Sequence, residues 1–263
     1  MLNYIKTGSG TQYIIFIHGN SQSAECWYEV TNQPLLANYT TIALDLPGHG
    51  DSFRSSKPEQ DYSLLGLAHY TLEFLRQFEH TPYILVGNSL ASNIIGEIAL
   101  QLKNCKGIVI TASCAAGKGI NIENILQPNP NLGAMFLEKP NEYQLNALIE
   151  DTVSNTTTEN KNLIKQLFIN TDLNFRVNFA NSIAAVTYTD ELQNIEDSGI
   201  ATAYVFGKEE KLCAIHYLDS IDLPKWKNKV LLIENSGHFS NIDQPKKLAE
   251  IISEFTEDCF KLL

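Results

Sequence analysis

Short apolar runs alternate with amphipathic stretches along this 263-residue chain, and that alternation restricts its possible folds more than any other feature. The runs are too short for helices and lie at 41–46, 83–87, 107–111, 201–207 and 229–234. Helical spacing of apolar residues is found at 64–78, 91–103 and 245–255. Strands that alternate with helices predict βαβ crossovers, and therefore an α/β fold with a mostly parallel central sheet and helices on both faces.

The N-terminal residues add one more prediction about the sheet. Two strand-like segments, 2–6 and 13–18, flank the glycine-containing sequence 7–10. Glycines between two such runs are typical of a turn that joins neighbouring strands. We therefore expect these segments to form an N-terminal hairpin.

The alternation stops between residues 115 and 196, where no strand pattern is found. Helices are predicted instead at 142–153, 158–169 and 173–188, and the polar tract 154–160 separates the first two. Helices inserted between two strands of one sheet indicate a cap over the edge of the sheet. The chain is thus predicted to consist of a core, 1–114 and 197–263, and a helical cap (lid), 115–196.

Charge and cysteine content exclude several classes of protein. The chain has 19 basic and 30 acidic residues, whereas binding to nucleic acid or to an anionic membrane needs clustered basic residues. Five scattered cysteines without a C-x-x-C pair argue against a disulfide framework or a cysteine zinc site, and favour a reducing compartment. Signal-peptide and membrane-span patterns are not found. We expect a cytoplasmic protein, monomer or homodimer, that acts on a small molecule and binds neither nucleic acid nor membrane.

The strongest chemical signal is a serine at a predicted strand-to-helix bend. Residues 84–91 read Ile-Leu-Val-Gly-Asn-Ser-Leu-Ala, which matches the nucleophile elbow G-x-S-x-G except that Ala91 replaces the second glycine. A serine whose hydroxyl is exposed at a sharp turn needs small residues two positions away, and Gly87 and Ala91 are small. Ser89 also begins a helix, where free N–H groups favour negative charge. Taken alone, Ser89 could equally be an ordinary helix N-cap.

Three further segments follow predicted strands. His238 lies after the last predicted strand and before the last helix, and residues 14–21 end a strand in His-Gly-Asn-Ser. Residues 45–52 read Asp-Leu-Pro-Gly-His-Gly-Asp-Ser and follow the next strand. Together with the serine elbow, these segments make the chain resemble the α/β-hydrolase superfamily over nearly its whole length.

The resemblance implies a catalytic triad in the chain order serine, acid, histidine. Ser89 and His238 are then the nucleophile and the base, and the acid is expected after the strand at 201–207. Glu209 and Glu210 both lie there, and we favour Glu210. The family's oxyanion hole implies the backbone N–H groups of Asn20 and Leu90 as donors. The loop 45–52, His18 and His49 are expected to be structural.

The mechanism implied by the resemblance needs no metal and no organic cofactor, and the histidines show no metalloprotease spacing. Ser89 would form an acyl-enzyme with a small or medium carboxylic ester or thioester. Apolar residues of the predicted cap are candidates for the substrate pocket. We name Met135, Phe136 and Phe168 as binding residues, and Leu132, Phe175 and Phe179 as further candidates.

Two alternatives remain open from the sequence, a carbon–carbon bond hydrolase and a small-molecule receptor, and a third, halide displacement, is set aside. The Gly-Asn-Ser elbow at 87–89 resembles that of the meta-cleavage product hydrolases, which break carbon–carbon bonds, although their oxyanion loop is richer in glycine. Haloalkane dehalogenases share His-Gly-Asn but need an aspartate where this chain has Ser89. A small-molecule receptor on the same fold could retain the triad, and turnover would distinguish it from an enzyme.

Overall fold

Seven strands form one sheet in the computed structural model, which describes residues 2–154 and 156–261. Their order in the sheet is β1-β3-β2-β4-β5-β6-β7, and each neighbouring pair except β1 and β3 is parallel. The strands are β1 (Tyr4–Thr7), β2 (Tyr13–Ile17), β3 (Thr40–Leu44), β4 (Tyr83–Asn88), β5 (Cys105–Thr111), β6 (Thr202–Gly207) and β7 (Leu231–Ile233). The predicted α/β fold with a mostly parallel sheet is confirmed.

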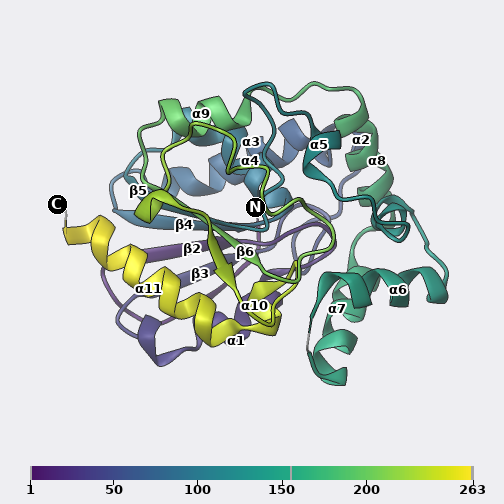
Figure 1. Cartoon of the computed structure of the whole chain (residues 1–263), viewed down its shortest axis with the longest axis horizontal. Helices are drawn as coiled ribbons and strands as arrows, with labels where there is room; N and C mark the ends of the chain where they lie inside the picture. Colours follow the sequence, from purple (N-terminus) through teal and green to yellow (C-terminus); the bar gives the residue numbers. More distant parts are fainter. Residues whose placement is uncertain (1, 155, 262–263) are drawn as a thin grey trace.

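Helices cover both faces of the sheet, as Figure 1 shows. One face is covered by α3 (Leu64–Leu75), α4 (Leu90–Ile98) and α9 (Glu191–Asp197), and the other by α1 (Tyr28–Thr31), α10 (Ser240–Asp243) and α11 (Pro245–Lys261). Because side chains alternate along a strand, β2 sends Ile15 and Ile17 into the core on the α3 side and Ile14 and Phe16 into the core on the α11 side. Burial on both faces explains the continuous apolar runs of the strands.

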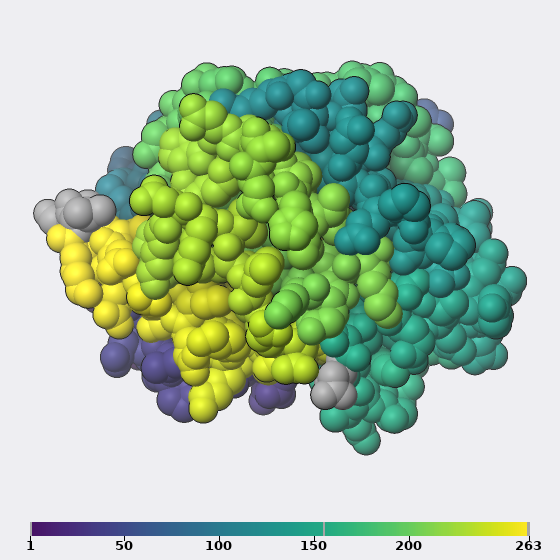
Figure 2. Space-filling model, viewed as in Figure 1, coloured from purple at the N-terminus to yellow at the C-terminus, as the bar shows by residue number. Residues whose placement is uncertain are grey.

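The part of the chain between β5 and α9 is helical and lies mostly at one side of the molecule, where its teal residues form the surface in Figure 2. It contains α5 (Ile122–Ile125), α6 (Glu142–Thr152), α7 (Thr158–Asn170) and α8 (Leu173–Ala184), and α8 contacts α2 (Pro58–Asp61). Three of these helices begin at side-chain N-caps, namely Asn141, Thr157 and Asp172. Residues 115–196 as a separate lid stay a prediction, because α9 crosses the proposed boundary and packs on α4.

Short 3₁₀ helices complete the chain. They are η1 (Ala24–Trp27), η2 (Pro34–Leu36), η3 (Arg76–Phe78), η4 (Ala99–Gln101), η5 (Leu132–Phe136) and η6 (Trp226–Asn228). The predicted helices at 64–78 and 91–103 each end in one of them, which is why α3 and α4 are shorter than expected. Residues 1, 155 and 262–263, which belong to the predicted core and to the polar tract of the cap, lie outside the described residues. Within the described part, no helix is both long and apolar enough for a membrane span.

The predicted N-terminal hairpin is wrong. β1 pairs antiparallel with β3, and β3 lies between β1 and β2. The linking segment passes close to the start of β3, because a Cβ at Gly8 or Gly10 would come within 2.2 Å or 2.0 Å of a carbonyl oxygen at residues 39 and 38. The glycines therefore permit a close crossing and do not form a two-strand turn.

The parallel strands bring four loops to one edge of the sheet. The loops that follow β2, β4, β6 and β7 carry Asn20, Ser89, Glu210 and His238 respectively. The strand ends are in register, since Ile17 pairs with Gly87 and Gly207 pairs with Ile233. In open parallel sheets this edge is where ligands and catalytic groups lie.

Gly207 allows the loops after β6 and β7 to touch, and replacing it tests this close approach. A Cβ at Gly207 would lie 2.2 Å from the carbonyl oxygens of Ser236 and Gly237. We expect Gly207→Ala to lower the free energy of unfolding by about 1–3 kcal/mol, as overpacking does. Gly133→Ala is the matched control, because a Cβ there meets no atom within 4 Å. Urea denaturation of both variants checks the prediction, and equal stability of the two would contradict it.

Candidate active site

Ser89 occupies a strained turn between β4 and α4. Its backbone φ is 53° and its ψ is −116°, a combination that non-glycine residues rarely adopt. The turn is tight, since a Cβ at Gly87 would lie 2.6 Å from Ile95 and 2.9 Å from Ala91. Gly87 is therefore required, whereas the methyl group of Ala91 is accommodated. The strain holds the serine hydroxyl at the edge of the sheet, as a nucleophile elbow does.

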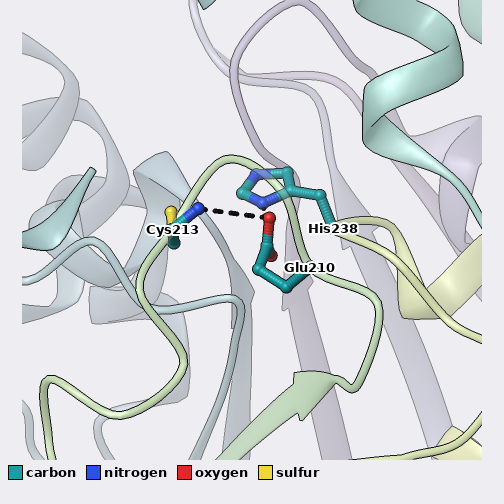
Figure 3. A group of neighbouring side chains, drawn as sticks. All are labelled: Glu210, Cys213 and His238. Atoms are coloured by element: carbon teal, nitrogen blue, oxygen red, sulfur yellow. Dashed lines mark hydrogen bonds and ion pairs between the residues drawn. The ribbon is translucent and has the colours of Figure 1, made fainter. Parts of the chain in front are cut away.

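His238 and Glu210 form a buried hydrogen-bonded pair. His238 Nδ1 donates to Glu210 Oε2 over 2.8 Å, and neither side chain is appreciably exposed. The other carboxylate oxygen, Oε1, accepts the backbone N–H groups of Leu212 at 2.7 Å and Cys213 at 3.2 Å. Figure 3 shows the Glu210 carboxylate between the His238 ring and the backbone nitrogen of Cys213. The carboxylate thus holds the ring in the tautomer whose Nε2 is free to accept a proton.

Glu209, the alternative acid, lies elsewhere. Its Oε2 accepts the backbone N–H of Ser236 at 2.8 Å, so Glu209 holds the loop that carries His238, whereas the hydrogen bond of His238 Nδ1 goes to Glu210. Of the two carboxylates, the structure places Glu210 against the histidine.

The hydrogen bond and ion pair with Glu210 determine whether the pKa of His238 is raised or lowered. Burial alone would lower the pKa of the imidazole, because it disfavours the charged form. The negative charge of Glu210 and the hydrogen bond to it outweigh burial, so the pKa of His238 is raised above its ordinary value. A raised pKa makes the ring a stronger acceptor for a proton from a nucleophile.

Ser89 and His238 line one cavity, but no hydrogen bond joins the Ser89 hydroxyl to the His238 ring among the described residues. The Ser89 Oγ instead lies 3.8 Å from the Sγ of Cys114. Catalytic hydrogen bonds are often long without substrate and shorten in the reacting complex. The structure therefore brings the two residues together in one cavity without the direct contact that proton transfer needs.

The two predicted oxyanion donors also border this cavity. Leu90 is the first residue of α4, so its N–H has no acceptor within the helix. Asn20 follows β2, and its side chain is held by Ser21 Oγ at 2.7 Å and by the carbonyl oxygen of Met135 at 3.4 Å. Both residues thus border the cavity that contains Ser89, and their role as oxyanion donors stays a prediction.

Two buried histidines hold the loops around Asn20. His18 Nε2 accepts the N–H of Leu46 at 3.0 Å, and His49 Nε2 accepts the N–H of Ser21 at 3.2 Å. Burial lowers the pKa of both rings, so both favour the neutral form that these contacts need. Asp45 accepts the N–H groups of Ala24 and Asp51 in the same region. These contacts hold the loops that follow β2 and β3 in place.

The cavity has a volume of about 290 Å³ and walls that are mostly apolar. Met135 and Phe136, two of the predicted binding residues, line it, as do the further candidates Leu132 and Phe179. Phe168 lies outside it, with its ring stacked against the guanidinium of Arg176 at 4.2 Å. The prediction for Phe168 is corrected accordingly: helical spacing identifies a buried face of α7, but not which cavity that face borders. Phe175 also lies outside it and contacts His49.

Two asparagines near Ser89 were not singled out from the sequence. Asn88 Nδ2 donates to Thr111 Oγ1 at 2.9 Å and to the carbonyl oxygen of His238 at 3.3 Å, so it ties the elbow to the histidine loop. Asn93 lines the cavity, and its Nδ2 donates inward to the Cys114 carbonyl and to Glu191. Asn93 lies four residues after Ser89 on the same helix, and that spacing is the signal that could have found it.

One group of side chains at the site has metal-ligating donors. Donor atoms of Glu210, Cys213 and His238 lie within 4.8 Å of one another (Figure 3). Glu210 and His238, however, already satisfy each other through the 2.8 Å hydrogen bond. A metal here would have to displace that bond, so the arrangement favours a proton relay.

Fold, elbow and buried histidine–carboxylate pair together are those of a hydrolase of the α/β class. A family model described as "Alpha/beta hydrolase family" matches residues 14–251, and the chain belongs to this family. It is 22% identical to monoacylglycerol lipase ABHD6 of Bos taurus over 267 residues, which cover 92% of this chain and 74% of the lipase.

Two solved structures illustrate the likeness of the fold. A mutant of N-acyl homoserine lactonase AidH, complexed with N-hexanoyl homoserine lactone, has a TM-score of 0.88 and 21% identity, and 99% of this chain and 95% of that chain are covered. A putative aryl esterase from Burkholderia cenocepacia has a TM-score of 0.82 and 17% identity, with 99% and 95% covered. The predicted α/β-hydrolase membership is confirmed, and lipases, esterases and lactonases are among the proteins that it is similar to.

Glu191, which supports Asn93, offers a test of the site's electrostatics. Burial raises the pKa of its carboxyl from about 4.5 to about 8. Between these values the folded chain keeps a proton that the unfolded chain has lost, so the free energy of unfolding falls as pH rises. Glutamine stays neutral and retains an oxygen to accept from Asn93 and Ala116. The stability of Glu191→Gln relative to wild type should therefore increase from pH 4.5 to about 8.

Urea denaturation of both proteins across this pH range measures that difference. Other titrating groups are common to both proteins, so their effects cancel in the stability difference between Glu191→Gln and wild type. A stability difference that does not change with pH would show that Glu191 is ionised when folded.

Proposed function

We propose that this protein is a serine hydrolase that cleaves an uncharged carboxylic ester through an acyl-enzyme on Ser89, with His238 as base and Glu210 as acid. The observation that carries the proposal is the buried 2.8 Å bond between His238 and Glu210, at the edge of the cavity that contains the strained Ser89. A histidine fixed by a carboxylate beside a serine is the arrangement that activates a hydroxyl nucleophile.

In the first half of the reaction, Nε2 of His238 takes the proton from Ser89 Oγ as this oxygen attacks the ester carbonyl carbon. Glu210 stabilises the imidazolium that forms. The negative charge on the carbonyl oxygen is accepted by the N–H groups of Asn20 and Leu90, and each such donor contributes about 3–4 kcal/mol to the stabilisation of the transition state. Collapse of the tetrahedral intermediate breaks the carbon–oxygen bond to the alcohol, which leaves with the proton from His238.

In the second half, His238 removes a proton from water, which attacks the acyl carbon. The same two amides stabilise the second oxyanion, and Ser89 leaves with the proton held by His238. The products are a carboxylic acid and the alcohol. Proton transfers begin and end with neutral His238, so the cycle needs no further reactant.

The cavity wall supports an uncharged substrate with an apolar acyl group. Apolar side chains from the segment between β5 and β6 form most of it; they are Ile122, Leu126, Leu132, Met135, Phe136, Phe179, Ala180, Ile183 and Ala184. Within the part of the chain that the structure describes, no lysine or arginine lines the cavity, so a carboxylate or phosphate on the substrate would find no counter-charge there. Ester bonds are also what the names of the similar proteins imply, since a lipase, an esterase and a lactonase all cleave them.

A fluorophosphonate probe tests the nucleophile. The probe should label the wild-type chain covalently and leave Ser89→Ala unlabelled, while His238→Ala should label far more slowly. Ser198→Ala is a control, because Ser198 lies at the end of α9, outside the cavity, and this variant should label at the wild-type rate. Mass spectrometry of the intact chain measures the adduct. Labelling of Ser89→Ala at the wild-type rate would rule out the nucleophile.

Turnover tests the substrate class. We expect continuous release of p-nitrophenol from esters of neutral acyl chains, and slower release when the acyl chain ends in a carboxylate. A matched series of acyl-thioesters compares the leaving groups. A single stoichiometric burst without turnover would instead favour a receptor on this fold.

Glu210 and Glu209 provide a matched pair for the acid. Glu210→Gln should lower kcat on the order of 10²–10⁴-fold, because the amide can hold the ring in the wrong tautomer. Activity requires neutral His238 and is lost as pH falls through its pKa. Since Glu210 raises that pKa, Glu210→Gln should also move the acidic limb of the pH–rate profile to lower pH. Glu209→Gln retains an oxygen for the Ser236 N–H and should do neither. The reverse ranking would assign the acid to Glu209.

A further inference from the structure

Two cysteines lie face to face in the wall of the cavity. Cys114 follows β5 and Cys213 follows β6, and their sulfur atoms are 3.1 Å apart. Both residues line the same cavity as Ser89, so a small molecule that enters the cavity can reach them. The proposed hydrolysis uses neither thiol.

We propose that Cys114 and Cys213 are a site of reversible oxidation, at which a peroxide converts the two thiols to a disulfide beside Ser89. The oxidation site is inferred from the contact between the two thiols alone. Its effect on hydrolysis, in contrast, depends on the proposed function.

The two thiols differ in a way that assigns the order of attack. The contact with Cys213 is the main cause that lowers the pKa of the Cys114 thiol; His238 and Ser89 act in the same direction and together with it outweigh burial and the charge of Glu210. The pKa of Cys213 is raised by the same contact and by burial. The thiolate is the form that attacks peroxides. Cys114 is therefore the first nucleophile, and Cys213 is the resolving thiol.

The chemistry balances with the peroxide as the only oxidant. The Cys114 thiolate attacks one oxygen of hydrogen peroxide, the O–O bond breaks, and after proton transfer the products are a sulfenic acid and water. Cys213 then attacks the sulfenic sulfur, the S–O bond breaks, and a second water leaves as the disulfide forms. Two thiols are oxidised by two electrons and one peroxide is reduced to two waters. A dithiol reductant reverses the change by thiol–disulfide exchange.

Closure of the disulfide would move the groups that position the proposed acid. A disulfide bond is about 2.0 Å long, so the sulfur atoms must approach by about 1 Å. The N–H of Cys213 donates to Glu210 Oε1, and the N–H of Cys114 donates to Ser92 Oγ, which itself donates to the Ser89 carbonyl. The oxidised pair therefore pulls on Glu210 and on the elbow together. We expect oxidation to lower hydrolysis.

The experiment treats the full chain, first reduced, with hydrogen peroxide in the presence of a metal chelator. Intact mass should show loss of two hydrogen atoms, and a non-reduced digest should contain the peptides of Cys114 and Cys213 joined. Ester hydrolysis should fall on the order of tenfold or more, as displacements of about 1 Å in an active site can produce, and dithiothreitol should restore it. Cys114→Ser should keep most of its own reduced activity under the same treatment, whereas Cys213→Ser should still form a sulfenic acid on Cys114 but no joined peptide.

Cys26→Ala is the matched control, since it also removes one buried cysteine but lies outside the cavity. It should form the disulfide and lose activity as wild type does. Mass and peptide mapping need no activity, so a joined Cys114–Cys213 peptide in a chain that hydrolyses no ester would overturn the proposed function and leave the oxidation site standing. Sulfinic acid on Cys114 without a cross-link would overturn the oxidation site. Inhibition in untreated protein that the chelator relieves, without peroxide-induced cross-linking, would overturn it in favour of a bound metal.

Discussion

Parallel pairing of β2, β4, β5, β6 and β7 is the constraint on which the rest of the site depends, because it directs four loops to one edge of the sheet. Direction alone does not bring the side chains into contact. The loops must also approach closely, and glycines at two strand ends permit this: Gly87 lets α4 pack against β4, and Gly207 lets the loop after β7 lie against β6. Asn88, the last residue of β4, then links the end of β5 to the loop that follows β7, since its amide donates to both Thr111 and the His238 carbonyl. The candidate site is thus a consequence of strand register and close backbone packing, and its polar contacts add precision to a position that is already set.

Two buried carboxyl groups near Ser89 show that neighbouring groups determine which role a buried carboxyl can have. Glu191 is surrounded by neutral donors, the amide of Asn93 and the N–H of Ala116, and one of its oxygens has no partner among the described residues. No positively charged group among the described residues offsets the desolvation of this carboxyl, so its pKa is raised to about 8 and it stays protonated at neutral pH. Glu210 is equally buried but contacts His238, a group that can become positive, and two backbone N–H groups. The first carboxyl supports the cavity wall as a neutral hydrogen-bonding group. The second is suited to stabilise a charge that appears on the imidazole during a reaction.

The sequence was informative where structure is determined locally. The elbow around Ser89 was recognisable because a strand, a bend and a helix succeed one another within a few residues, and the loops of Glu210 and His238 were recognisable because each follows a strand. Pairing between distant strands was not, since β1 has the same local pattern whether its partner is β2 or β3. Periodicity also identifies buried faces without naming what they contact, which is why Phe168 was assigned to the wrong cavity. The contact between Cys114 and Cys213 joins residues 99 positions apart, and the support of Asn93 by Glu191 spans 98. Neither has any local signal.

The helical segment between β5 and β6 contributes more than a wall to the cavity. The carbonyl of Met135, in η5, accepts from the Asn20 side chain, and Arg176, in α8, donates to Ser21 Oγ, which in turn donates to Asn20. Arg176 is 2% exposed and also donates to the carbonyl oxygens of Leu137, Glu138 and Phe168, so a buried cation ties this segment together and to the loop after β2. Burial lowers the pKa of Arg176 to about 10, which leaves the guanidinium charged at neutral pH and its hydrogen bonds charge-assisted. A displacement of η5 or α8 would therefore change both the apolar wall and the contacts of the Asn20 side chain. The apolar wall of the cavity and the loop that carries Asn20 are physically coupled in this arrangement, because the same hydrogen bonds hold both.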